Sequence, residues 1–267
     1  MMESSRTYLP AAGHDWSLPL YDPIVKLLGG DAARRALLEQ AALRLGQRVL
    51  DVGCGTGTLA TLTKQLYPDV AVVGLDPDPK ALARARRKAA RAAVSIQFDQ
   101  GFGDELPYPE AWFDRVFSSF MFHHLQPDEK GKTLRAVRRV LKAGGEFYML
   151  DFEGPEDGAH GFLAHLLHSS DRMKDNSEGR VLSLMSQAGF LDPKKVGRRR
   201  MLFGGVAYYR AGVAGRACLP EGALEGRGFG RADTAHRSFS SGAERNDPRS
   251  RKSGGGVFTR ASQKSAA

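Results

Sequence analysis

The residues best suited to chemistry cluster in the stretch RVLDVGCGTGTLA, at positions 48–60. An acid, Asp51, stands just before Gly53, Gly55 and Gly57, which alternate with small residues. Glycines between a strand and a helix let the backbone turn sharply and approach a ligand closely. The N-terminus of the following helix would add free amides and a positive dipole end, suited to a carboxylate or a phosphate. The stretch therefore predicts a nucleotide-type binding loop.

The spacing of these glycines excludes two common phosphate-binding loops. The dinucleotide fingerprint is G-x-G-x-x-G, but Thr58 stands where its last glycine would be. A P-loop would need a Gly-Lys-Ser or Gly-Lys-Thr sequence, which does not follow here. The Asp51 carboxylate would repel a pyrophosphate, whereas it suits a ligand that carries an ammonium group.

A second group of reactive side chains lies further along the chain. His123 and His124 follow the apolar stretch FDRVFSS, and Asp151 comes near the end of EFYMLDF. Imidazole titrates near neutral pH, so a histidine at the ligand-binding edge of a sheet could position or deprotonate an acceptor. A packed histidine with a backbone partner, and an aspartate that caps a turn, are the structural alternatives. The sequence leaves both interpretations open.

The elements that must hold these residues alternate between strand and helix. This order is typical of an α/β fold, a doubly wound and mostly parallel sheet with helices on both faces. After a helix that begins at 177 and ends at Gly189, two β segments without a helix between them predict an antiparallel C-terminal hairpin in a seven-stranded sheet. The expected strands cover 48–53, 70–76, 94–98, 113–119, 146–152, 194–203 and 205–211, and the other helices cover 31–45, 58–66, 78–92 and 128–141.

Four stretches in this order resemble the class I S-adenosylmethionine-dependent methyltransferases, over about residues 14–211. The similarity is to the small-molecule branch, including the enzymes that methylate quinone rings, and it implies a Rossmann-like methyltransferase fold with S-adenosyl-L-methionine as cofactor. The matching stretches are VLDVGCGTG, VVGLDPDPKALARARRKA, FDRVFSSFMFHHL and AVRRVLKAGGEFYMLDF.

The resemblance also implies roles for individual residues. Asp51 and the glycine loop would hold the methionine part of the cofactor, and Asp76 would accept hydrogen bonds from both ribose hydroxyls. Phe102 stands where the family often has the aspartate that binds the adenine amine, so Phe102, the Gly103 backbone or Asp104 would replace that contact. The expected cofactor-binding residues are Asp51, Gly53, Cys54, Gly55, Gly57, Asp76, Pro77, Phe102, Gly103, Ser118 and Ser119, and the expected catalytic residues are His123, His124 and Asp151.

We expect three segments: an N-terminal helical lid segment over 1–45, the methyltransferase domain over 46–211, and a disordered basic tail over 212–267. His14, Trp16 and Tyr21 could form the lid, or simply pack. Residues 211–267 hold 10 of the 39 Lys and Arg residues but 5 of the 30 Asp and Glu residues, and they show no apolar period. Two cysteines and the lack of an apolar run of about 20 residues predict a cytoplasmic protein without a membrane span.

The predicted function is methyl transfer from S-adenosyl-L-methionine to a small-molecule acceptor by in-line displacement. A quinone acceptor is disfavoured, because Pro23 follows Tyr21 and Asp22 where the quinone enzymes carry Met-Asn, and because Asp151 and Glu153 replace Glu-x-Ser. Nucleic acid is an unlikely partner, since the tail lacks regularly interleaved aromatic residues. No metal site is expected, although His160, His165 and His168 have a metal-like spacing.

Two alternatives remain: an RNA or protein methyltransferase guided by the basic tail, and a non-catalytic cofactor-binding module suggested by the missing adenine-binding aspartate. The identity of the acceptor, the atom that is methylated and the oligomeric state are not predicted.

Overall fold

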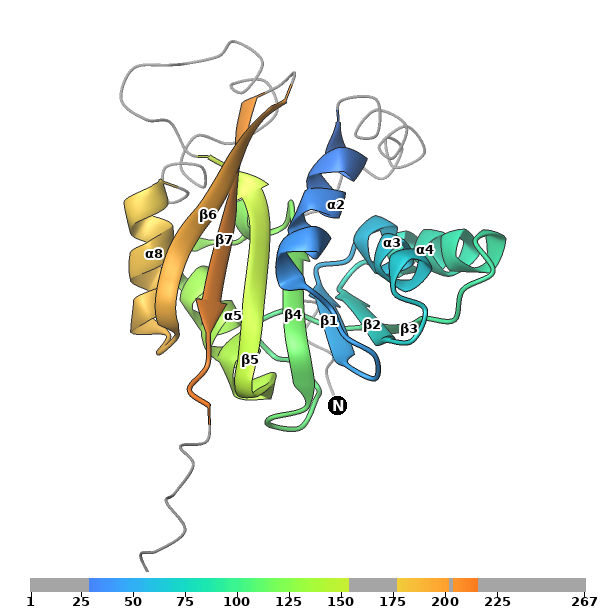
Figure 1. The fold of residues 1–267 in the computed structure, drawn as a ribbon, viewed down its shortest axis with the longest axis horizontal. Coiled ribbons are helices and arrows are strands. Elements are labelled where there is room, and N and C mark those ends of the chain that lie inside the picture. Colours follow the sequence, from blue (N-terminus) through green and yellow to red (C-terminus); the bar gives the residue numbers. More distant parts are fainter. Residues whose placement is uncertain (1–28, 154–176, 202–203, 216–267) are drawn as a thin grey trace, which may run out of the picture. The chain divides into compact units, whose positions relative to one another are not determined.

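The computed structural model describes residues 29–153, 177–201 and 204–215, all of which belong to a compact unit spanning Met1–Cys218. These residues form one sheet in the order β3-β2-β1-β4-β5-β7-β6 (Figure 1). The strands are β1 (Arg48–Val52), β2 (Ala71–Asp76), β3 (Gln97–Gln100), β4 (Phe113–Ser119), β5 (Leu141–Phe152), β6 (Leu191–Met201) and β7 (Gly204–Gly212).

Strands β1 to β5 pair in parallel, and β7 pairs antiparallel with both β5 and β6. This arrangement confirms the expected doubly wound sheet with a C-terminal hairpin. The chain order reverses between β1 and β4, and in such sheets ligands bind beyond the carboxyl ends of the strands at this switch point.

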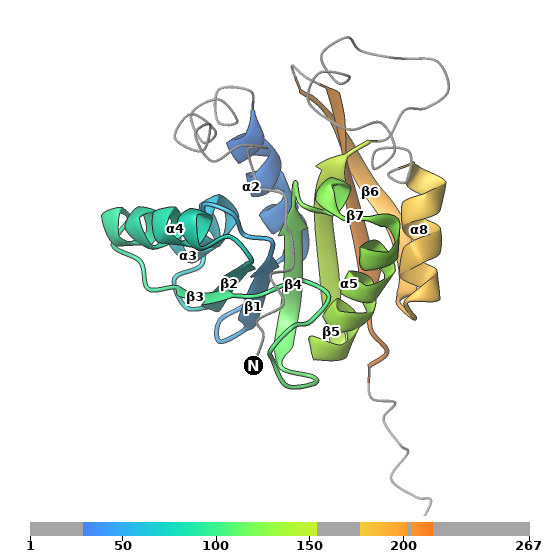
Figure 2. The same ribbon diagram turned by 180° about the vertical axis from the view of Figure 1, so that it is seen from behind.

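Helices cover both faces of the sheet (Figures 1 and 2). Apolar side chains of α2, α3 and α4 join one buried cluster, and those of α5 and α8 join the other. The five α-helices within the described ranges are α2 (Gly30–Ala41), α3 (Thr58–Leu66), α4 (Pro79–Arg91), α5 (Pro127–Val140) and α8 (Glu178–Gln187), and a short 3₁₀ helix, η2, covers Phe122–His124.

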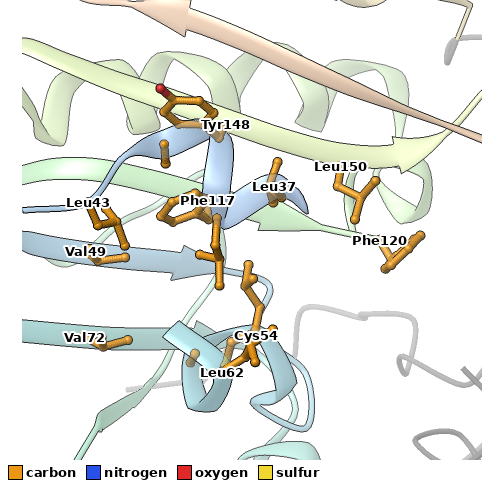
Figure 3. Close-up of a cluster of buried hydrophobic side chains, with 14 of the residues drawn as sticks. Leu37, Leu43, Val49, Cys54, Leu62, Val72, Phe117, Phe120, Tyr148 and Leu150 are labelled. Atoms are coloured by element: carbon orange, nitrogen blue, oxygen red, sulfur yellow. The ribbon is translucent and has the colours of Figure 1, made fainter. Parts of the chain in front are cut away.

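Helix α2 belongs to the core of this unit. Figure 3 shows its Leu37 among Phe117 of β4 and Leu150 of β5, and all three side chains are fully buried. The hydroxyl of Tyr208 on β7 donates a hydrogen bond to the Ala33 carbonyl at 3.2 Å. Burying a leucine side chain contributes about 2 kcal/mol to the free energy of unfolding, so the packing of α2 stabilises the sheet.

Three strands begin three or more residues away from their expected starts, and one of them is β6, which begins at Leu191 rather than 194. Strand β3 begins at Gln97 rather than 94, because the chain first turns through Ala93, which has a positive φ of 52°, and Val94 still donates to Ala89 O of α4. Strand β5 begins at Leu141 rather than 146, with a register shift where it pairs with β4. The basic stretch 197–200 lies on β6, which is an edge strand as expected.

Some expected features fall outside the described residues. They include His14, Trp16, Tyr21 and Pro23 of the predicted lid, and His160, His165 and His168. Backbone hydrogen bonds continue to Ala214, whose carbonyl accepts from Gly144 N, and the predicted tail from 216 onward is not described. The three segment boundaries remain predictions.

Candidate functional site

The glycine loop connects the end of β1 to the start of α3. The amides of Gly53 and Cys54 both donate to the Leu75 carbonyl of β2, at 2.8 and 3.0 Å. Gly53, Gly55 and Gly57 have positive φ angles of 69°, 53° and 73°, a region that favours glycine. The sharp strand-to-helix turn expected from the sequence is therefore present.

At two of these glycines, neighbouring side chains occupy the space that a Cβ atom would need. A Cβ atom at Gly57 would lie 2.7 Å from the Ala85 Cβ atom of α4. A Cβ atom at Gly53 would collide with the Met121 side chain, which follows β4. The loop is thus held between α4 on one side and the segment after β4 on the other.

Asp76 lies at the end of β2 and faces this loop. Its Oδ2 atom accepts from Gly55 N at 2.8 Å, and its Oδ1 atom accepts from Asp78 N at 2.9 Å. Burial raises the pKa of Asp76 to about 6, although these two amides oppose the shift. Because a carboxylate has about four acceptor positions, both oxygens can accept further hydrogen bonds.

Asp51 lies one strand away and is almost completely buried, at 1% exposure. Within the described part of the chain, neither carboxylate oxygen has a hydrogen-bond partner of ordinary geometry. Burial raises the pKa of Asp51 to about 7, while the Arg34 charge and the Ala60 amide lower it and the Asp76 charge raises it. A buried carboxylate without a partner is costly, so this position is suited to a cationic ligand group.

His123 and Asp151 form a buried pair on the other side of the switch point. The His123 Nδ1 atom lies 2.6 Å from Asp151 Oδ1, and both residues are at most 3% exposed. Asp151 also accepts from His123 N at 3.2 Å and from Phe152 N at 2.7 Å. With Nδ1–H donating to the carboxylate, a neutral His123 carries its basic lone pair on Nε2.

His124 takes a different position from its neighbour. Its ring centroid lies 4.0 Å from that of His123, and the side chain is only partly buried. Asp151 therefore orients His123, and the His124 ring lies beside the His123 ring.

The remaining candidate residues lie around the same edge. Pro77 precedes α4, and its carbonyl accepts from Gln100 Nε2 at 3.2 Å. Gly103 packs close to Val52 and Thr133, and the buried Ser118 hydroxyl has no partner among the described residues. Phe102 and Ser119 are partly buried.

Cys54, inside the loop, is a buried free thiol. Burial raises the pKa of the Cys54 thiol well above its usual value, and the charges of Asp51 and Asp76 raise it further. Since the thiolate is the reactive form, Cys54 is suited to packing rather than to nucleophilic chemistry.

Two residues near this edge were not identified from the sequence. Arg34 of α2 is 5% exposed and lies near Asp51, and Met121 packs against Gly53. A signal for Arg34 existed, because it precedes the buried Leu37 and Leu38 by three and four residues and so shares the apolar face of α2. No comparable pattern marks Met121.

The described ranges contain no cluster of three or more His, Cys, Asp or Glu side chains that could hold a metal ion. Among those same residues, no helix combines the length and the apolar character needed to cross a membrane.

Comparisons with known proteins agree with this geometry. Residues 49–145 match the family described as "Methyltransferase domain". The chain is 34% identical over 209 residues to a demethylmenaquinone methyltransferase of Deinococcus radiodurans, which covers 74% of this chain and 86% of that protein. It is 37% identical over 148 residues to a demethylmenaquinone methyltransferase of Thermus thermophilus, covering 54% and 66%.

Solved structures show the same fold. A phosphoethanolamine N-methyltransferase of Haemonchus contortus, in complex with S-adenosyl-L-methionine, aligns with a TM-score of 0.61 at 16% identity. The alignment covers 76% of this chain and 58% of that one.

Proposed function

The chain belongs to the family of S-adenosylmethionine-dependent methyltransferases, and on that premise we propose that it methylates a small hydroxylated aromatic ring, with His123 as the general base. The observation that carries this proposal is the 2.6 Å contact between His123 Nδ1 and Asp151 Oδ1. The pair lies on the same edge of the sheet as Asp51 and Asp76, across the switch point between β1 and β4.

The residues around the glycine loop fit the cofactor. Asp51 offers an ammonium group two buried oxygens that have no hydrogen-bond partner among the described residues, and Asp76 retains acceptor positions for two ribose hydroxyls. The positive φ angles of the loop bring its backbone close to a ligand without a Cβ in the way. When bound, S-adenosyl-L-methionine supplies an electrophilic methyl group on a sulfonium.

The His123–Asp151 pair would prepare the acceptor. Asp151 holds the imidazole in the tautomer whose Nε2 atom accepts a proton, and it stabilises the imidazolium that results. Removing a proton from a ring hydroxyl raises the electron density on that oxygen and on the adjacent ring carbon. Either atom then becomes a better nucleophile for in-line attack on the methyl group.

The acceptor class rests on the relatives. A reduced quinone, which is a dihydroxylated aromatic ring, fits both the names of the demethylmenaquinone methyltransferases and a base at His123. The sequence departures that disfavour a quinone include Pro23, which lies outside the described residues, and Asp151 and Glu153. Asp151 supplies a carboxylate to His123, while Glu153 forms ion pairs with Lys195 and Arg198.

Titration calorimetry with S-adenosylhomocysteine tests the cofactor site. We expect Asp76→Ala to weaken binding by about 100-fold, because two charge-assisted hydrogen bonds to the ribose are lost. Asp114→Asn is the control, since Asp114 also accepts a backbone amide, from Arg48 at 2.8 Å, but lies at the start of β4. Equal affinities for wild type and Asp76→Ala would contradict the assignment.

Steady-state kinetics with a short-chain reduced demethylnaphthoquinone under anaerobic conditions test the base. We expect His123→Asn and Asp151→Asn each to lower kcat by about 100-fold. Affinity for S-adenosylhomocysteine should stay within about twofold, and His124→Asn, the neighbouring control, should keep most of the activity. Full activity in His123→Asn would remove His123 from the proposed role.

A further inference from the structure

Glu153 directly follows β5 and has a nearly buried side chain, which is 10% exposed. Its Oε1 atom lies 2.7 Å from Lys195 Nζ, and its Oε2 atom forms an ion pair with Arg198 Nε. Both cations belong to β6, and in the sheet β7 lies between β5 and β6 (Figure 1). The Glu153 side chain therefore crosses one strand to reach its partners.

The strand that Glu153 crosses has a glycine at the crossing point. A Cβ atom at Gly205, the second residue of β7, would collide with Glu153 Oε2 and would lie 3.5 Å from Arg198 Nε. A glycine within a strand has no side chain to pack against the neighbouring strands. The Glu153 carboxylate occupies the space that a β7 side chain would fill at this position.

The crossing lies beside Asp151. Asp151 and Glu153 are two residues apart in an extended segment, so their side chains point to the same face of the sheet. Asp151 and Arg198 lie in one row, because both are paired with Ala207 of β7. Beyond these pairs, Glu153 N donates to Gly205 O at 3.0 Å. The Glu153 side chain adds a second tie, from the end of β5 to the edge strand.

His123 depends on the exact place of Asp151. Its Nδ1 atom lies 2.6 Å from Asp151 Oδ1, and the same carboxylate accepts from two backbone amides. An error of about 1 Å in such a contact can lower a rate by about 100-fold. The Arg198 side chain is 53% exposed, and exposed ion pairs add little to stability. The Glu153 contacts are therefore better suited to fixing the end of β5 than to stabilising the fold.

We propose that Glu153 is a positioning residue, which holds Asp151 against His123 by fixing the end of β5 to β6. This inference rests on the proposed function, because it takes His123 as the base. Glu153 acts through Asp151 and needs no contact with the acceptor or with the cofactor. Its loss should therefore change the histidine–carboxylate contact and kcat, and not ligand affinity.

Proton NMR of the full chain, labelled with ¹⁵N-histidine, tests the contact without turnover. A proton on His123 Nδ1 in a short hydrogen bond to a carboxylate gives a signal far downfield, and Asp151→Asn, which removes that carboxylate, identifies the signal. We expect Glu153→Gln, which keeps the volume of the side chain and removes its charge, to shift this signal upfield or to broaden it beyond detection.

Steady-state kinetics give the second measurement. Glu153→Gln should lower kcat by about 10-fold, while KM for the short-chain reduced demethylnaphthoquinone and the affinity for S-adenosylhomocysteine stay within about twofold. Gly205→Ala should act in the same direction, because its Cβ atom displaces the Glu153 carboxylate. In a Glu153→Ala background, Gly205→Ala should have no further effect on kcat.

Glu146→Gln is the matched control. Glu146 is also a glutamate of β5 with two cationic partners, Arg115 and Arg210. Glu146→Gln should leave the Nδ1 signal unchanged and kcat within about twofold. If Glu153→Gln fails to fold, as judged by circular dichroism, Gly205→Ala carries both measurements.

The outcomes separate the inference from the proposed function. An unchanged Nδ1 signal in Glu153→Gln, or an equal loss of kcat in Glu153→Gln and Glu146→Gln, would overturn the positioning role. If the wild-type chain methylates no acceptor while Glu153→Gln alone shifts the signal, the proposed function fails and Glu153 still positions Asp151.

Discussion

Asp51 and Asp151 are two buried carboxylates at the same edge of the sheet, yet their surroundings are opposite. Each is 1% exposed, and each lies one residue before the end of its strand. Asp151 accepts three hydrogen bonds, two from His123 and one from the Phe152 amide. Asp51 has no partner for either oxygen within the described residues. The protein itself supplies the hydrogen-bond donors of Asp151, whereas the Asp51 carboxylate is left for a ligand to neutralise.

The same difference extends beyond these two residues. Glu146 on β5 pairs with Arg115 and Arg210 and accepts from the Tyr148 hydroxyl. In contrast, the loop half holds two carboxylates whose pKa values burial raises, Asp51 and Asp76. An unpaired buried charge lowers stability, so the loop half gives up stability that ligand binding can restore.

The largest expected effect is on the stability of the ligand-free protein when each of the two carboxylates, Asp151 and Asp51, is removed. Asp151→Ala should lower the free energy of unfolding by about 3 kcal/mol, because the His123 ring and two backbone amides lose their acceptor. Asp51→Asn should act in the opposite direction at about pH 8, raising it by about 2 kcal/mol, since a desolvated charge is replaced by a neutral amide.

Chemical denaturation measures both changes. Asp114→Asn serves as a carboxylate control, because Asp114 pairs with Lys142 at 2.8 Å near the surface. If Asp51→Asn and Asp151→Ala destabilised the protein equally, the contrast between the two halves would be lost.

The second prediction concerns pH. Burial raises the pKa of Asp51 to about 7 and that of Asp76 to about 6, from a usual 3.8. At pH values between the usual pKa of 3.8 and the raised pKa values, the folded state binds more protons than the unfolded state. The free energy of unfolding therefore falls as pH rises through this range. From about pH 5.5 to about pH 7.5 the ligand-free protein should lose about 2 to 3 kcal/mol.

Affinity for S-adenosylhomocysteine should move the other way over the same window. An ammonium group binds the ionised form of Asp51, so affinity should rise by about 10-fold. Titration in buffers of different ionisation enthalpy should detect proton release on binding. Asp51→Asn should flatten most of both pH dependences, and a wild-type stability that rose with pH would contradict the assignment of these two carboxylates.

The sequence predicted the strands of a mostly parallel sheet and the glycine loop, because both depend on local patterns. Apolar runs mark the buried parallel strands, and the glycines at 53, 55 and 57 mark the turn. The start of β3 was misplaced, because Ala93 adopts a positive φ that alanine rarely takes and that no residue type announces.

The site was only partly predictable, because its charges are balanced across long sequence separations. His123 and Asp151 were both candidates, but their contact joins residues 28 positions apart and depends on the register of β4 and β5. The Arg34 charge lowers the pKa of Asp51 only because α2 packs against the sheet, where its Leu37 joins the buried cluster that includes Phe117. Such pairings depend on tertiary packing, which local sequence patterns do not predict.

The smallest expected effect is a difference in stability between alanine variants of two glycines. One position requires glycine for its backbone conformation alone, and the other also lacks space for a Cβ atom. Gly57 in the loop and Gly144 on β5 have nearly the same φ, 73° and 74°. A Cβ atom at Gly144 would meet nothing within 4 Å, whereas at Gly57 it would lie 2.7 Å from Ala85 Cβ.

Gly144→Ala should therefore cost about 1 kcal/mol of stability, from backbone strain alone. Gly57→Ala should cost about 2 kcal/mol more, because the loop or α4 must shift to relieve the clash. Chemical denaturation of the two variants gives this difference directly, and calorimetry shows whether the shift reaches the ligand. Gly57→Ala should weaken S-adenosylhomocysteine binding, because Gly57 belongs to the loop that follows Asp51 and faces Asp76. Gly144→Ala should not, because Gly144 lies on β5. Equal stability losses would mean that the loop is pliable, and that the unpaired charge of Asp51 is not held in place by a rigid backbone.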